Sequence, residues 1–140
     1  MSARRILPSS RVLPSPDRYA SELHRAILDE VIAAVERDAV VIVGMAWNPS
    51  CGTARKAFSS RGIEHTYLEY GNYLSKWRER LVIKQWSGWP LYPQVFVHGV
   101  LVGGAARTGK AFESGLIQRL LDAGRDGVEA VVAQEWASVS

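Results

Sequence analysis

The chain has 140 residues, which suits one domain large enough to bury a hydrophobic core. Hydrophobic residues make up 47% of it, and the formal net charge of +3 is too small to argue for nucleic-acid binding. No apolar run approaches the roughly 20 residues that span a bilayer, and a single cysteine excludes both an internal disulfide and a cysteine-rich metal site.

The first 16 residues are rich in arginine, serine and proline and contain no acidic residue. Such a composition is also found in organelle transit peptides. The prolines Pro8, Pro14 and Pro16 argue against a helix and favour a disordered tail over residues 1–16. Because the segment has no apolar core of a secretory signal, we expect a cytoplasmic protein.

From Asp17 onward the sequence alternates between helical and strand patterns. Apolar residues at helical spacing predict a leading helix that ends before Ala39, and the β-branched run Val40–Val43 predicts a buried strand. The elements expected after it are a helix over 51–61, a strand over 64–69, a helix over 74–86, a hairpin of 94–97 with 100–102, and a helix from 103 to about 121. This order implies two parallel strands followed by an antiparallel hairpin. We assign residues 17–122 to one α/β domain and leave residues 123–140 as a C-terminal tail or helix.

Two segments in the second half of the chain resemble glutaredoxins. Residues 89–104, WPLYPQVFVHGVLVGG, are similar to the glutaredoxin segment that contains a cis-proline and ends in a Gly-Gly pair. Residues 113–116, ESGL, are similar to part of the glutaredoxin C-terminal helix. The resemblance runs from about Val40 to Asp122. It implies a thioredoxin-like (glutaredoxin) fold, a mixed four-stranded sheet flanked by helices with an extra N-terminal helix, and glutathione-linked redox chemistry.

The lone cysteine can be aligned with that family in two registers. In one register Cys51 matches the nucleophile of the monothiol pattern P-x-C-G-F-S. In the other, Asn48-Pro49-Ser50-Cys51 matches C-P-Y-C, so that Cys51 takes the resolving position and Asn48 replaces the nucleophile. The spacing to the glycine that ends the helix favours the second register. Asn48 is then the N-cap, Pro49 the first helical residue and Cys51 the third.

In this register Cys51 is either a buried structural residue or a functional thiol. A helix N-terminus favours the thiolate that attacks disulfides. A free cysteine, however, is more often a small buried hydrophobic side chain. Both interpretations predict that Cys51 is turned inward, away from the position that Asn48 occupies.

The resemblance also implies a glutathione pocket. Its residues would be Arg80, Lys84, Tyr92, Pro93, Gly104, Ala105 and Ala106. Arg80 and Lys84 are equally consistent with a solvated helix face. Three positions depart from the family pattern: Met45 stands where a lysine is usual, Leu91 replaces a threonine, and Ala106 replaces an aspartate.

These features lead to two main functional hypotheses. The first is a glutathione-dependent thiol-disulfide oxidoreductase of weak activity that uses Cys51 alone. The second is a glutaredoxin-fold binding module that has lost its chemistry. In both cases the expected partners are glutathione or protein thiols, with no nucleic acid and no membrane. A monothiol-type carrier of a 2Fe-2S cluster is the least favoured alternative, because Asn48 holds the place of the ligating cysteine.

Overall fold

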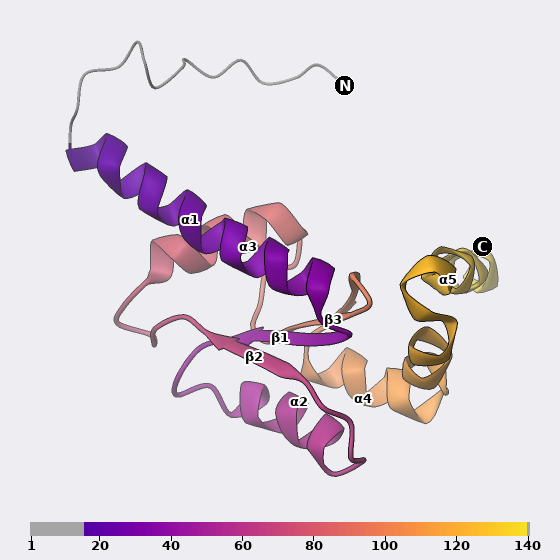
Figure 1. Cartoon of the computed structure of the whole chain (residues 1–140). Coiled ribbons are helices and arrows are strands. Elements are labelled where there is room, and N and C mark those ends of the chain that lie inside the picture. Colours follow the sequence, from indigo (N-terminus) through magenta and orange to yellow (C-terminus); the bar gives the residue numbers. More distant parts are fainter. Residues whose placement is uncertain (1–15, 140) are drawn as a thin grey trace.

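The computed structural model describes residues 16–139, with side chains from residue 24 onward. Figure 1 shows its elements, which are α1 (Pro16–Arg37), β1 (Val40–Gly44), α2 (Pro49–Ser59), β2 (Thr66–Glu69), α3 (Trp77–Ser87), β3 (Gln94–Val97), β4 (Val100–Gly103), α4 (Ala105–Glu113) and α5 (Leu116–Ser138). The four strands form one sheet in the order β2-β1-β3-β4. β1 runs parallel to β2 and antiparallel to β3, and β3 runs antiparallel to β4. The predicted mixed sheet and leading helix are therefore confirmed.

Helices cover both faces of this sheet. α1 and α3 lie on one face, and α2 and α4 lie on the other (Figure 1). Alternate residues of β1 point to opposite faces, so Val41 and Val43 join one core cluster while Val40 and Ile42 join the other. Burial on both faces explains why this strand is continuously apolar instead of alternating.

A two-residue turn joins β3 to β4. His98 and Gly99 both have positive φ, at 45° and 82°. This is the conformation of the tight turn whose twist matches that of paired strands. The hairpin predicted from the His98-Gly99 pair is confirmed.

The helix predicted over 51–61 extends over Pro49–Ser59, and two larger differences occur further along the chain. α3 begins at Trp77 instead of Leu74, because Lys76 adopts a left-handed conformation with a φ of 53° and ends a loop. The predicted last helix is divided, because Gly115 has a φ of 80° and separates α4 from α5. Apolar periodicity continues across both breaks and does not reveal them.

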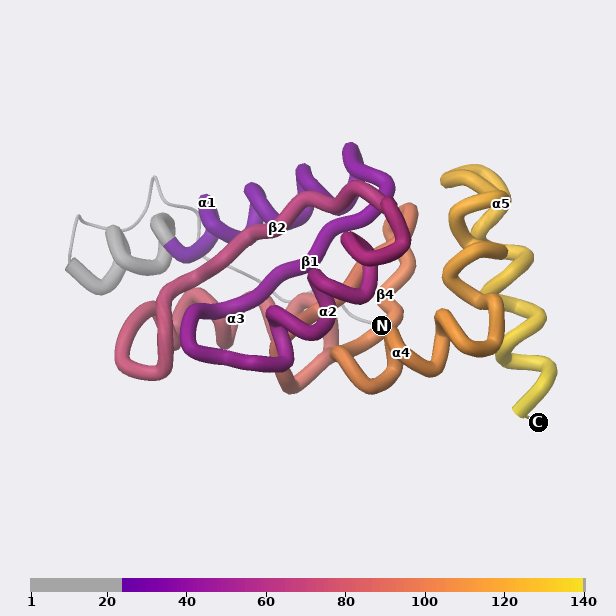
Figure 2. The backbone as a smooth tube through the Cα atoms, turned by 90° about the horizontal axis from the view of Figure 1, so that it is seen from below, coloured from indigo at the N-terminus to yellow at the C-terminus, as the bar shows by residue number. Residues whose placement is uncertain are grey.

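The C-terminal residues continue the helical structure to Ser138. α5 contains a non-helical residue, Gly124, and its second part folds back beside the first (Figure 2). An ion pair of 2.6 Å between Arg119 and Glu135 joins the two parts, and Val128 is buried in the core. At the other end of the chain, the tail predicted over residues 1–16 lies outside the described residues except for Pro16, which begins α1.

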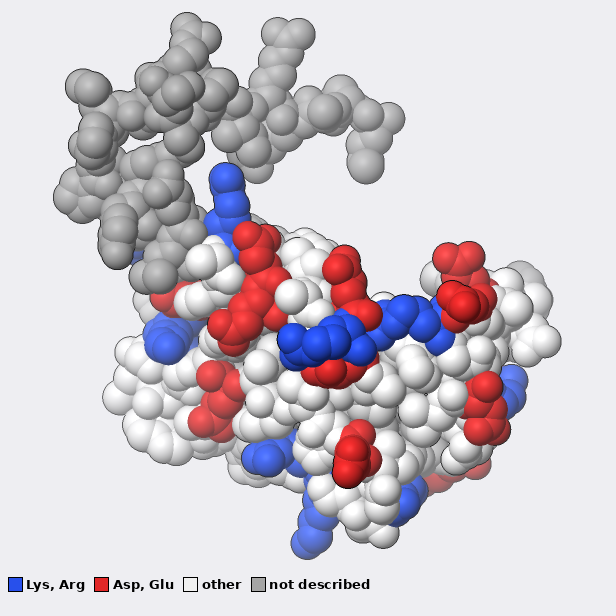
Figure 3. Space-filling view, viewed as in Figure 1, with Lys and Arg blue, Asp and Glu red and all other residues white. Residues whose placement is uncertain are grey.

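The surface on the side of α1 carries interspersed charges. On the face seen in Figure 3, Lys and Arg side chains lie among Asp and Glu side chains, without a continuous basic stripe. This face therefore gives no support to nucleic-acid binding. Within residues 16–139, every helix is too short or too polar to cross a bilayer.

Candidate active site

The first turn of α2 begins as the sequence predicts. Asn48 is the N-cap, and its Oδ1 accepts a hydrogen bond of 2.9 Å from the Ser50 N–H. Pro49 is the first helical residue, where its fixed φ fits and its missing N–H costs nothing. Cys51 therefore takes the third helical position, one turn away from the side chain of Asn48.

Cys51 faces the sheet and is almost completely buried, with 2% of its surface exposed. Its Sγ lies against Gly44 of β1 and the hydroxyl of Tyr67 on β2. A Cβ on Gly44 would stand only 2.9 Å from this sulfur and 2.7 Å from the Tyr67 oxygen, so only glycine leaves enough room here. The thiol is thus packed between α2 and the ends of two parallel strands.

The surroundings of Cys51 disfavour its thiolate. Burial raises the pKa of the Cys51 thiol, although hydrogen bonds from the Met45 backbone N–H and the Tyr67 hydroxyl act in the opposite direction. The negative charge of Glu69 raises this pKa further. The nucleophilic form is therefore scarce at neutral pH, in contrast to the acidified thiols of active redox sites.

We expect Cys51 to react with an aromatic disulfide reagent at least about 100-fold more slowly in the native protein than in denaturant, because attack requires both exposure and ionisation. Raising the pH should accelerate the native reaction only above the ordinary cysteine pKa, since the folded pKa is raised. Stopped-flow absorbance at several pH values, with and without urea, measures both effects. Equal rates in the native and unfolded protein at pH 7 would show that Cys51 is accessible.

The segment before β3 lies beside the N-cap. The Tyr92–Pro93 peptide bond is cis, as the resemblance predicts, and both residues are buried. The Nδ2 of Asn48 donates a hydrogen bond of 3.4 Å to the Tyr92 carbonyl oxygen. The structure thus brings Asn48 next to the Tyr92–Pro93 segment, although Asn48 and Tyr92 are 44 residues apart along the chain.

Arg80 is placed differently from the expectation of a solvated helix face. Only 7% of its surface is exposed, and its guanidinium donates to the backbone carbonyls of Tyr70 and Ser75 at 3.0 and 2.5 Å. Its own carbonyl accepts a hydrogen bond of 2.6 Å from the Tyr92 hydroxyl. Arg80 therefore connects the loop before α3 to the cis-proline segment. Contact of Arg80 with glutathione remains a prediction.

The other predicted glutathione-binding residues line the same region. The Lys84 ammonium lies 5.5 Å from the centre of the Tyr92 ring. Gly104 is the N-cap of α4 and has no side-chain cap, so the helix begins with backbone N–H groups at Ala105 and Ala106. A Cβ at Gly104 would lie 3.6 Å from the Pro93 carbonyl oxygen, which places this helix start next to the cis-proline.

Comparison with known proteins agrees with this arrangement. The family model described as Glutaredoxin matches residues 40–102. A glutaredoxin-like protein of Dictyostelium discoideum is 39% identical over 114 residues, which cover 81% of this chain and 91% of that protein. The chain belongs to the glutaredoxin family. A probable monothiol glutaredoxin of Legionella pneumophila is 32% identical over 85 residues, covering 59% of this chain and 89% of that protein.

Solved structures of glutaredoxins have the same fold as this chain. Oxidised glutaredoxin 2 from Chlamydomonas reinhardtii has a TM-score of 0.62 and 23% identity, covering 71% of this chain and 94% of that chain. A buckwheat glutaredoxin–glutathione complex has a TM-score of 0.61 and 18% identity, covering 78% of this chain and 94% of that chain. At these identities the likeness concerns the fold alone.

Sequence patterns did not reveal one part of this glutaredoxin site. The hydroxyl of Tyr67 contacts the Cys51 region and donates a 3.1 Å hydrogen bond to Glu69, while the Arg55 guanidinium lies 4.1 Å from the Tyr67 ring centre. Tyr67 pairs with Ile42 in the parallel register of β1 and β2. The sequence does not give this register, so it does not identify Tyr67 as the strand residue that reaches the Cys51 thiol. Among the side chains of residues 24–139, no three His, Cys, Asp or Glu residues group to hold a metal ion.

Proposed function

We propose that this chain is a glutathione- or thiol-binding member of the glutaredoxin family with weak or lost thiol-disulfide activity. One observation carries the proposal: the side chain that faces the cis-proline segment is Asn48, which has no sulfur, while the sole cysteine is buried beneath it. A disulfide substrate bound along Tyr92–Pro93 would meet an amide where a nucleophile is needed.

Glutathione binding is supported by the features of the groove that remain. The uncapped start of α4 offers N–H groups to a carboxylate, and Lys84 supplies a nearby positive charge. Two other features of the groove argue against tight glutathione binding. The Tyr92 carbonyl already accepts from Asn48, and Ala106 carries no polar side chain for the tripeptide. The fit is therefore partial, and the affinity should be low.

We expect glutathione to bind with a Kd in the millimolar range, equivalent to about 4 kcal/mol. Isothermal titration calorimetry of the native protein measures this affinity. Lys84→Met should weaken the binding, while Lys110→Met, at an exposed residue in the last turn of α4, serves as a charge-matched control. A micromolar Kd would show that other contacts compensate for the lysine and the aspartate that Met45 and Ala106 replace.

The same protein should be nearly inactive in reducing glutathione mixed disulfides. A glutathione-reductase-coupled assay on native protein and Cys51→Ser tests this directly. We expect both to remain near the uncatalysed rate. Robust native activity that Cys51→Ser abolishes would assign Cys51 as the nucleophile and overturn the proposal.

A non-catalytic binding module is the second candidate, and the buried Arg80 favours it. The Asn48 side chain donates to the Tyr92 carbonyl, the Arg80 guanidinium holds the loop before α3, and the Arg80 carbonyl accepts from the Tyr92 hydroxyl. This arrangement preserves the shape of the groove without contributing to chemistry. Glutathione or thiol-peptide binding in the complete absence of turnover would select this candidate.

A 2Fe-2S cluster carrier fits the residues poorly, even though several relatives are named monothiol glutaredoxins. A cluster needs a thiolate that can reach iron, whereas Cys51 is 2% exposed and its pKa is raised by burial. We therefore assign no cluster to this chain.

A further inference from the structure

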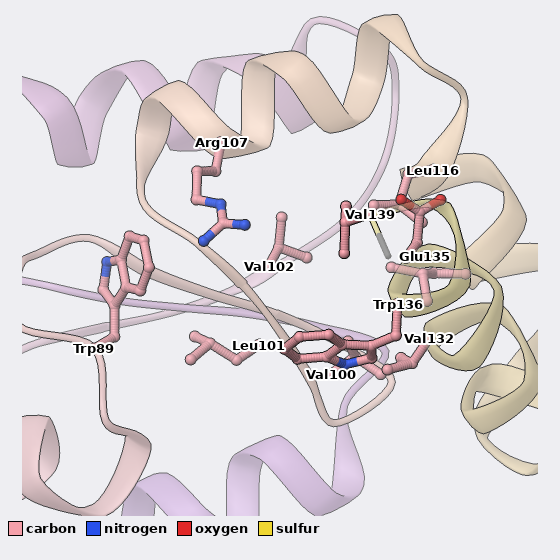
Figure 4. A pocket seen from close by; sticks show the side chains of 11 residues that line it. Trp89, Val100, Leu101, Val102, Arg107, Leu116, Val132, Glu135, Trp136 and Val139 are labelled. Carbon is pink, nitrogen blue, oxygen red and sulfur yellow. The ribbon is translucent and has the colours of Figure 1, made fainter.

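A second recess adjoins the groove around Pro93 at Trp89, which lies beside Gly104. It has a volume of about 390 Å³ and runs between the edge strand β4 and the last turns of α5 (Figure 4). None of the seven candidate glutathione-binding residues lines it. We call it the β4–α5 groove. Its volume lies within the range of about 300–1,000 Å³ that is typical of small-molecule sites.

The walls of the β4–α5 groove are apolar. Val100, Leu101 and Val102 of β4 form one side, and Val132, Trp136 and Val139 of α5 lie across from them (Figure 4). Trp136 is 73% exposed and Val139 is 75% exposed, so these side chains leave much of their surface in water. Covering them with an apolar ligand would recover part of the hydrophobic free energy.

Two charged side chains, Glu135 and Arg107, line the β4–α5 groove, and among the described side chains only Glu135 of these two has an ion-pair partner. Glu135 is neutralised by its ion pair with Arg119 at 2.6 Å. Arg107 of α4 points into the space between Trp89 and Val102 (Figure 4), with its guanidinium 5.4 Å from the centre of the Trp89 ring. Among residues 24–139, no carboxylate lies within ion-pair distance of Arg107. The groove thus offers one uncompensated cation at the end of an apolar channel.

We infer that the β4–α5 groove binds a small amphiphile with an aliphatic body and a terminal carboxylate. The carboxylate pairs with Arg107, whose planar guanidinium suits bidentate hydrogen bonding. The aliphatic body lies along β4 against Trp136. This inference uses neither Cys51 nor any of the seven candidate glutathione-binding residues, although the two sites adjoin where Trp89 lies beside Gly104.

A homologous series of n-alkanoates tests the inference by calorimetry on the full chain, with every ligand kept below its micelle concentration. Affinity should rise about fourfold per added methylene from hexanoate to octanoate, the gain expected for burying one CH₂ group. Octanol should bind about tenfold more weakly than octanoate, because it lacks the charge-assisted pair. Octylamine should bind more weakly still.

Substitutions of two exposed side chains separate the role of the Arg107 charge from that of the apolar wall. Arg107→Gln should weaken octanoate binding about tenfold and leave octanol binding unchanged, since only the ion pair is lost. Trp136→Glu should weaken both ligands about tenfold or more. Lys110→Gln on the same helix and Trp77→Glu on α3 are the matched controls, and each should bind octanoate like the native protein.

Several results would overturn the inference. These are octylamine binding as tightly as octanoate, an affinity that does not change with chain length, or an unchanged octanoate affinity in Arg107→Gln. Absence of octanoate binding at millimolar concentration would do the same. If sedimentation shows a dimer that Trp136→Glu dissociates, a second copy of the chain occupies the groove instead.

Discussion

Asn48→Cys should raise the rate of glutathione mixed-disulfide reduction about a hundredfold or more over the native protein. A positioned nucleophile contributes on the order of 10⁴-fold or more to catalysis in other enzymes, and under the proposed function this nucleophile is what the side chain beside the cis-proline segment lacks. The Asn48 side chain already points toward the Tyr92 carbonyl and the start of α2. A thiol at this position would face the cis-proline segment with its pKa lowered by the helix N-terminus.

The expected mechanism of the variant needs only the new sulfur. The new thiolate attacks the glutathionyl sulfur of the mixed disulfide and releases the reduced thiol of the substrate. The thiolate of a second glutathione then attacks the protein–glutathione disulfide, which releases oxidised glutathione and restores the new thiol, while Cys51 lies buried one helical turn away. The variant should lose about 1 kcal/mol of stability, because Asn is among the best N-caps and Cys is not. A glutathione-reductase-coupled assay measures the activity, and urea denaturation measures the loss of stability.

Two companion variants make this result interpretable. Asn48→Ser keeps a good N-cap but has no thiol, so it should stay near the native rate. The double variant Asn48→Cys/Cys51→Ser should keep most of the activity on small glutathione disulfides, because the new thiol performs the attack. If Asn48→Cys folds and gains nothing, the groove itself has diverged and the non-catalytic binding module becomes the better assignment.

The sequence predicted those parts of this protein that depend on local chemistry. Asn48-Pro49 predicted the start of α2, the β-branched run predicted β1, and His98-Gly99 predicted the hairpin turn, all of which the structure confirms. Each of these signals is contained within a few neighbouring residues. The cis bond before Pro93 came from the resemblance to glutaredoxins and not from any physical pattern.

The parts that were missed depend on tertiary packing. Tyr67 reaches Cys51 only because β2 lies beside β1 in one particular register. Arg80 looks like a surface residue in the sequence, but the loop before α3 wraps over it and supplies two carbonyls. A charged side chain can be buried when hydrogen bonds satisfy it, and those partners are not adjacent in the sequence.

Removal of the Arg80 guanidinium should have the largest effect on stability. We expect Arg80→Met to lower the free energy of unfolding by about 2–4 kcal/mol, because two carbonyls lose a charged donor and each unpaired buried group costs about 1–3 kcal/mol. Methionine keeps a similar length and apolar stem, so the loss reports mainly on the hydrogen bonds to Tyr70 and Ser75. Urea denaturation followed by tryptophan fluorescence measures the change.

Arg80→Lys and Arg78→Met distinguish a structural role for Arg80 from direct ligand binding. Both carbonyls accept from the same Nη1 atom, at the far end of the guanidinium, and the shorter lysine side chain reaches this place less well. Arg80→Lys should therefore recover only part of the stability. Arg78 is exposed on the same helix, and Arg78→Met should change stability by less than about 0.5 kcal/mol. If Arg80→Met is as stable as the native protein but no longer binds glutathione, its guanidinium serves the ligand and not the loop.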